Sequence, residues 1–154
     1  MTTNAHSQDS LYPDWTIRKF LVLENGERWT PAISRQLKES VKAANIPISV
    51  GVERVPDVRS LLKQSQQATT PGVILFLESR ERECVTAISR ISQLTSHPFV
   101  LAVGSGKHQE LLPVLLESGI CTPLFDIVND VPVVEWCIKV VRSRSALSSA
   151  DAKS

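Results

Sequence analysis

Two short polar stretches carry residue types that could do chemistry. Glu78 and Ser79 follow directly after the apolar run 73–77, and the stretch 104–107 follows a second apolar run, 99–103. Strands that are apolar throughout are typical of the middle of a parallel sheet, and α/β folds place ligands and reacting groups beyond the carboxyl ends of such strands. We therefore expect both stretches to line one crevice at the same edge of a sheet.

The second stretch, which reads Gly-Ser-Gly-Lys, has the composition of an anion-binding loop. Backbone N–H groups that lead from a strand into a helix can hold a phosphate, and Ser105, Gly106 and Lys107 are the candidate donors, with His108 facing the same crevice. A nucleotide phosphate loop also needs glycine at Leu101 and Ser or Thr at His108, and both are missing. The pattern argues against nucleotide hydrolysis and leaves open a simpler anion site or an ordinary turn.

Other candidate ligands and nucleophiles are sparse. Glu24 and Glu78 could share a divalent cation at the ends of adjacent strands, but two carboxylates without a third ligand make a weak site. Cys84, Cys121 and Cys137 form no CxxC pair and have no histidine suitably placed to activate them, which predicts buried thiols in a reducing compartment. We predict no metal, no cofactor and no enzyme activity.

Composition narrows the class of protein. The 154 residues fit one domain, 42% of them are apolar and 21% charged, and the net charge of +1 gives no reason to expect nucleic acid or an anionic membrane surface. Apolar runs fall short of a membrane span, and the N-terminal residues lack the hydrophobic region of a secretory signal, so we expect a cytoplasmic location. The expected boundaries are a flexible arm at 1–15, one domain at 16–143, and a disordered Ser-rich tail at 144–154.

Strand-like and helix-like segments alternate along the chain. Thr30 should be the N-cap of the first helix, because Pro31 suits the first helical position. The expected strands are 16–23, 48–52, 73–77, 99–103 and 120–128, and the expected helices are 30–44, 57–68, 80–94, 109–118 and 131–146. Such alternation calls for right-handed crossovers and a mostly parallel sheet. We predict a flavodoxin-like three-layer α/β/α sandwich with five strands in the order 2-1-3-4-5.

Several of these segments look like parts of one known domain. Residues 20–25 look like a first strand ending in an acidic pair, residues 71–77 like a strand leading to a phosphoacceptor aspartate, and residues 98–103 and 118–119 fit the later framework. From about residue 18 to about residue 142, the chain thus resembles the receiver domain of bacterial two-component response regulators.

The resemblance also implies a reaction centre that is incomplete here. An active receiver uses an acidic pair to hold Mg²⁺, an aspartate to accept phosphate, a Ser or Thr after the fourth strand, and a Lys after the fifth, because metal and Lys neutralise the transferred phosphoryl group. The corresponding positions are Glu24-Asn25, Leu77 or, with a one-residue shift, Glu78, and Val103 or, with slippage, Ser105, while residues 121–130 contain no lysine. The resemblance therefore implies a degenerate receiver, or pseudo-receiver.

We predict a non-catalytic signalling or scaffolding module that acts through protein–protein interaction. Two alternatives are a small-ligand or anion sensor that uses the carboxyl-end crevice, and an atypical phosphoreceiver in which Glu78 or Ser79 accepts phosphate. Glu78 could also imitate the charge of a phosphoaspartate permanently, or it could be an ordinary solvated carboxylate.

The expected helix 109–118 is apolar on more than one face, so some of its side chains should be exposed. In receivers, dimers and partners dock on the fourth helix, fifth strand and fifth helix. We predict self-association or a protein partner through 109–118 and 131–146, and the face would consist of Leu111, Leu112, Leu115, Leu116 and Trp136. The alternative is that a kink at Pro113 and the long fifth strand cover these residues.

Overall fold

The computed structural model describes residues 17–153, with side chains described as far as Ser143. The expected N-terminal arm, 1–15, lies outside the described residues. The strands are β1 (Arg18–Leu23), β2 (Val50–Arg54), β3 (Gly72–Phe76), β4 (Phe99–Gly104) and β5 (Cys121–Phe125). The helices are α2 (Thr30–Ala43), α3 (Val58–Ser65), α4 (Glu81–Ile91), the 3₁₀ helix η2 (Gly106–Leu111), α5 (Leu112–Glu117) and α6 (Val131–Lys153).

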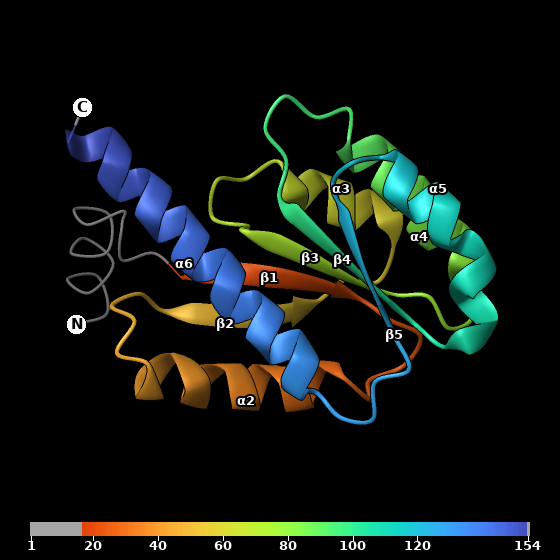
Figure 1. The fold of residues 1–154 in the computed structure, drawn as a ribbon, viewed down its shortest axis with the longest axis horizontal. Coiled ribbons are helices and arrows are strands. Elements are labelled where there is room, and N and C mark those ends of the chain that lie inside the picture. The colour runs from red at the N-terminus through yellow and green to blue at the C-terminus, as the bar shows by residue number, and fades with distance from the viewer. Residues whose placement is uncertain (1–16, 154) are drawn as a thin grey trace, which may run out of the picture.

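All five strands are parallel and lie in the order β2-β1-β3-β4-β5, which confirms the predicted flavodoxin-like topology (Figure 1). Helices α2 and α6 pack together on one face of the sheet, while α3, α4 and α5 cover the other. Among the described residues, none of the helices combines the length and apolar character that crossing a bilayer requires.

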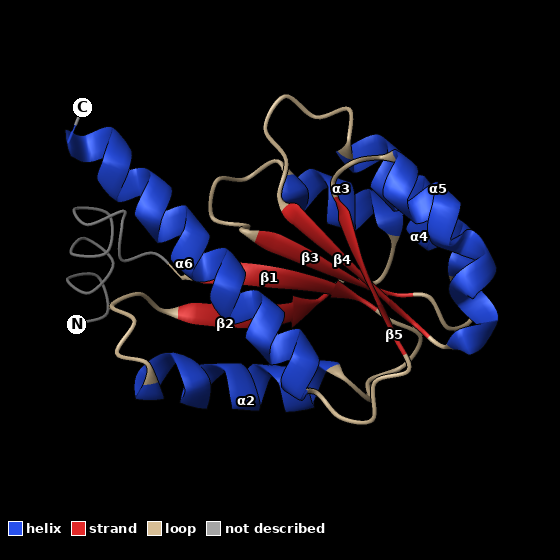
Figure 2. Ribbon diagram, viewed as in Figure 1, coloured by secondary structure: helices blue, strands red, loops and turns tan. Residues whose placement is uncertain are grey.

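Strand β3 lies in the middle of the sheet (Figure 2), and all five of its residues are buried. Ile74 and Phe76 belong to the cluster beneath α2 and α6, and Val73 and Leu75 belong to the cluster beneath α3, α4 and α5. Each large apolar side chain buried in this way contributes about 1.5–3 kcal/mol to stability. The continuous apolar run of β3 is therefore required by a sheet that is covered on both faces.

The helix expected at 109–118 is instead two short helices. A 3₁₀ helix spans Gly106–Leu111, and α5 begins at Leu112, with Pro113 in its first turn. Proline has no backbone N–H, so inside a helix it cannot donate a hydrogen bond to the carbonyl four residues earlier. In the first turn of a helix that hydrogen bond is not required, and proline fits there. Pro113 thus lies in the first turn of a helix, whereas its place in the sequence predicted a kink within one.

Several strand and helix boundaries also differ from expectation. β2 begins at Val50, two residues later than expected, and β5 ends at Phe125 because Asp126 adopts a left-handed backbone conformation with φ 57°. The backbone of α6 continues to Lys153, through most of the segment 144–154 that the sequence predicts as a tail. The three domain boundaries themselves stay predictions.

Close packing at the start of β3 explains the glycine there and places Trp136. A Cβ atom at Gly72 would lie 2.7 Å from the Phe20 ring and 2.8 Å from the Trp136 ring. These two rings meet edge to face, with centroids 5.9 Å apart. Trp136 is half-buried and packs against the core cluster beneath α2 and α6, and its part in an interaction face stays a prediction.

We expect Gly72→Ala to lower the free energy of unfolding by about 1–3 kcal/mol, because the added methyl group has no space among these rings. Urea denaturation followed by far-ultraviolet circular dichroism would measure the change. Gly106→Ala is the matched control, since its Cβ would meet only the Asp126 carboxylate at ordinary contact distance. Equal stability of wild type and Gly72→Ala would contradict the packing described here.

Candidate functional site

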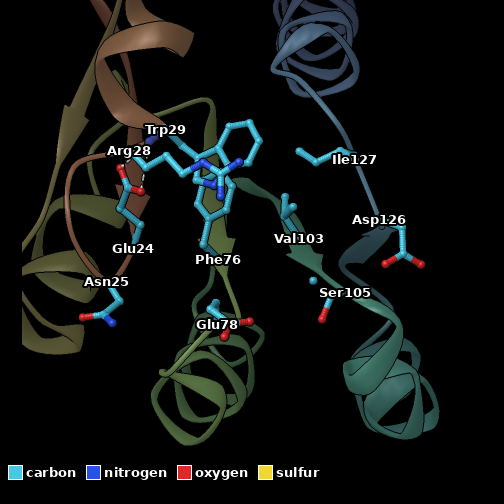
Figure 3. Close-up of a pocket in the computed structure, with 11 residues that line it drawn as sticks. Glu24, Asn25, Arg28, Trp29, Phe76, Glu78, Val103, Ser105, Asp126 and Ile127 are labelled. Atoms are coloured by element: carbon cyan, nitrogen blue, oxygen red, sulfur yellow. Dashed lines mark hydrogen bonds between the residues drawn. The ribbon is translucent and has the colours of Figure 1, made fainter.

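A crevice of ≈ 570 Å³ opens at the carboxyl edge of the sheet. We call it the carboxyl-edge crevice. Its lining residues are Glu24, Asn25, Arg28, Trp29, Phe76, Glu78, Val103, Gly104, Ser105, Asp126 and Ile127 (Figure 3). The structure thus brings together Glu24, Asn25, Glu78, Val103 and Ser105, as their places after the strands suggested. Leu77 is not part of this lining.

Glu24 is a buried carboxylate that caps helix α2. Its side chain accepts hydrogen bonds from the backbone N–H of Trp29 at 3.1 Å and of Thr30 at 2.8 Å, and from the Thr30 hydroxyl at 2.6 Å. A carboxylate that accepts N–H groups at a helix N-terminus satisfies otherwise unpaired donors and interacts favourably with the helix dipole. Glu24 therefore serves the first turn of α2, and only 2% of the residue is exposed.

This arrangement corrects the expected helix start. The N-cap residue is Trp29, whose side chain makes no capping bond, and Thr30 is the first helical residue. The capping acceptor comes from the end of β1, five and six residues earlier in the chain, so local sequence rules for capping would not identify it.

Leu77 cannot take part in chemistry at the crevice, because it is fully buried beneath α3, α4 and α5. Its backbone N–H donates to the Val103 carbonyl at 2.8 Å, which continues the pairing of β3 with β4. Of the two residues that the resemblance offered for the phosphoacceptor position, only Glu78 faces the crevice. Successive residues of an extended strand point to opposite sides, which explains why Leu77 is buried while the adjacent Glu78 faces the crevice.

Glu78 is paired with a lysine from the neighbouring loop. Lys107 Nζ lies 2.7 Å from Glu78 Oε1, and this hydrogen bond raises the pKa of Lys107. Both side chains are more than half exposed, so the pair contributes little to stability. It nevertheless gives Glu78 and Lys107 a partner within the chain.

The other donors of the proposed anion loop are engaged as well. The Ser105 N–H donates to His108 Nδ1 at 3.0 Å, and the Gly106 N–H donates to Asp126 Oδ1 at 2.8 Å. A carboxylate from the end of β5 thus holds the position where a bound anion would accept from Gly106. An anion site at Ser105, Gly106 and Lys107 stays a prediction, and each of these donors would have to exchange its present partner.

His108 does not face the crevice, contrary to expectation. It is 3% exposed, and its Nε2 lies 3.2 Å from Glu81 Oε1 at the start of α4. Because Nδ1 accepts the Ser105 N–H, Nε2 carries the proton and donates it to Glu81. The hydrogen bond from His108 lowers the pKa of Glu81. His108 therefore connects the loop after β4 to the first turn of α4.

Trp29 and Arg28 form a feature of the crevice that was not predicted from the sequence. The Trp29 ring stacks on Phe76, with centroids 5.5 Å apart and an interplanar angle of 11°. The Arg28 guanidinium carbon lies over the Trp29 ring, 4.8 Å from its centroid (Figure 3). The available signal was an Arg-Trp pair between the end of a strand and the start of a helix, where side chains reach the carboxyl edge.

Metal ligands and reactive thiols do not converge at this site. Within the part of the chain that the structure describes, no group of three or more His, Cys, Asp or Glu side chains could hold a metal ion. Burial raises the pKa of the Cys84 thiol to about 12 and of Cys121 to about 11, and it raises that of Cys137 as well. Raised thiol pKa values disfavour the nucleophilic thiolate.

The predicted interaction face is exposed only in part. Leu115 is fully buried, Leu111 and Leu112 are half-buried, and Leu116 is 52% exposed. Val114, two residues before Leu116 on α5, is also exposed. The large apolar residues that α5 offers to a partner are therefore Leu116 and Val114.

Comparison with known proteins supports the fold but not a closer relationship. No protein-family model matches the sequence, and no curated protein matches it. A solved structure of a response regulator receiver domain (CheY-like) from Methylobacillus flagellatus is similar, with a TM-score of 0.54 over 82% of this chain and 99% of that chain. The sequence identity is 14%, so the similarity is one of fold. The receiver-like fold implied by the sequence is thereby confirmed.

We expect Glu24→Ala to lower the free energy of unfolding by about 1–3 kcal/mol, because it removes the acceptor for three donors at the start of α2. Chemical denaturation would measure the change. Glu27→Ala, in the exposed turn before the same helix, is the control and should change stability by no more than about 0.5 kcal/mol. Similar effects of the two substitutions would show that Glu24 is not a structural cap.

Proposed function

We propose that the protein is a non-catalytic receiver-like signalling or scaffolding module, which is not phosphorylated in the way of an active receiver and acts through contacts with proteins. The single observation that carries this proposal is the use of Glu24 as a buried helix cap. At the position where an active receiver would hold Mg²⁺, this chain has a carboxylate already committed to backbone donors.

The chemistry of phosphoryl transfer supports the same conclusion. Transfer to a carboxylate needs an accessible nucleophilic oxygen and fixed positive charge around the transferred group. Here Leu77 is a core residue, and Glu78 has Lys107 as its partner. The Asp126 carboxylate lies just past β5, in the region where a receiver has its lysine, and it would repel a phosphoryl group.

Contacts with other proteins are the function that remains for such a domain. Leu116 and Val114 are exposed apolar residues on α5, and burying them against a partner would remove apolar surface from water. The resemblance to receivers implies docking on this side of the domain, and we propose the same use for α5 here.

Incubation with acetyl phosphate and Mg²⁺, followed by intact-mass measurement, tests the loss of phosphorylation. We expect no added phosphoryl group, because Glu24 is committed to the start of α2, Glu78 is paired with Lys107, and the described residues offer no group of three or more His, Cys, Asp or Glu side chains that could hold Mg²⁺. An active receiver domain treated in parallel should gain a phosphoryl group, which would show that the reagent is active. An added phosphate that hydroxylamine removes, as it removes an acyl phosphate, and that is absent in Glu78→Gln would overturn the proposal and identify an atypical phosphoreceiver.

Sedimentation velocity of wild type and Leu116→Asp tests the interaction face. We expect wild type to self-associate with increasing concentration and Leu116→Asp to weaken this at least about tenfold, because a charge would be buried in the interface. Val128→Asp is the matched control, since Val128 is an exposed apolar residue outside α5. A wild-type chain that stays monomeric throughout would exclude self-association through α5.

A further inference from the structure

The Trp29 ring is the centre of a slot in the carboxyl-edge crevice. Its stacking on Phe76 fixes the ring plane, and the guanidinium of Arg28 lies over the ring. Val103 and Ile127 supply apolar wall across the crevice (Figure 3). A flat, delocalised cation suits an aromatic face, because the electrons of the ring attract it and it is only weakly hydrated.

The charges around the slot favour a cation over an anion. Glu24, Glu78 and Asp126 all line the crevice, whereas Arg28 is the cation among the described lining residues. Glu78 is offset by Lys107, but Asp126 accepts only the Gly106 N–H and forms no ion pair within the described part of the chain. The carboxylates would therefore attract a positively charged ligand and repel a negatively charged one.

Arg28 is held loosely enough to leave this slot. Its residue is exposed, and in the described part of the chain its side chain has the ring contact but no ion pair. A cation–π contact at an exposed site is worth only about 0.5–1 kcal/mol. The side chain can thus move into solvent at small cost and give its place to another group of the same chemistry.

We propose that the carboxyl-edge crevice is a binding site for a guanidinium group, and that Arg28 occupies it as an intramolecular competitor. The group would come either from a free guanidinium compound or from an arginine side chain of a partner. The crevice volume of ≈ 570 Å³ lies within the range of about 300–1,000 Å³ typical of small-molecule sites, so it has room for the group and its attached chain. This inference does not depend on the proposed loss of phosphorylation.

Substitution of Arg28 distinguishes a cation site from an anion site, because it should strengthen the binding of a cation and weaken the binding of an anion. The crosspeaks of the Trp29 indole and the Gly106 amide would be followed by NMR during titration with agmatine and, separately, with inorganic phosphate. We expect Arg28→Gln to bind agmatine at least about fivefold more tightly than wild type, the equivalent of about 1 kcal/mol of released competition. Arg28→Lys, which keeps a positive charge, should bind less tightly than Arg28→Gln.

The opposite result would overturn the inference. Arg28→Gln would then bind agmatine no better than wild type, or wild type would bind phosphate and lose it in Arg28→Gln, as an anion site requires. Arg28 is exposed, so its substitution should leave the fold intact, and a thermal melt of each variant would check this.

A second variant tests the carboxylate independently of the ring. Asp126→Asn keeps an acceptor for the Gly106 N–H and tolerates the left-handed backbone, but it removes the negative charge. We expect agmatine binding to weaken several-fold in this variant, and unchanged binding would count against the site. Titration with N-acetylarginine methylamide distinguishes the sources: tighter binding than agmatine points to an arginine of a partner, and weaker binding points to a free compound.

Discussion

The hydrogen bonds between the Glu24 carboxylate and the start of α2 are the interaction on which the carboxyl edge depends. They join the end of β1 to the first turn of the helix and set the position of Trp29, whose N–H is one of the donors. Because Trp29 then stacks on Phe76 at the end of β3, one buried carboxylate fixes the geometry of two neighbouring strand ends. The aromatic wall of the crevice therefore depends on the hydrogen bonds that Glu24 accepts.

The crevice is a site whose polar groups are mostly paired within the chain. Lys107 neutralises Glu78, Asp126 accepts the Gly106 N–H, and Arg28 covers Trp29. Internal pairing of this kind engages the polar side chains at the strand ends with one another, while the sheet beneath them has the receiver-like strand order. A similar fold therefore does not by itself specify the chemistry at its strand ends.

Two polar contacts tie the loop after β3 to the loop after β4. One is the exposed pair of Lys107 and Glu78, and the other is the buried His108 with Glu81. His108 also accepts the Ser105 N–H, so the loop that resembles an anion-binding turn is organised by a core histidine. Close contact of Gly104 with Leu77 and His108 leaves no room for a side chain there, which explains the first glycine of that loop by packing.

The sequence by itself determined the sheet, its strand order and the two-sided burial of β3. The spacing of apolar residues and the turn residues define each strand and helix locally, and the rules for connecting strands through helices then allow few topologies. It also marked about half of the crevice residues, because the carboxyl ends of parallel strands meet at one edge of the sheet. It could not determine that Glu24 turns to cap α2, that His108 points inward, or that Trp136 packs on Phe20. Those outcomes depend on which partner lies nearest in space, and residues distant in the chain become neighbours only after the sheet and helices have packed.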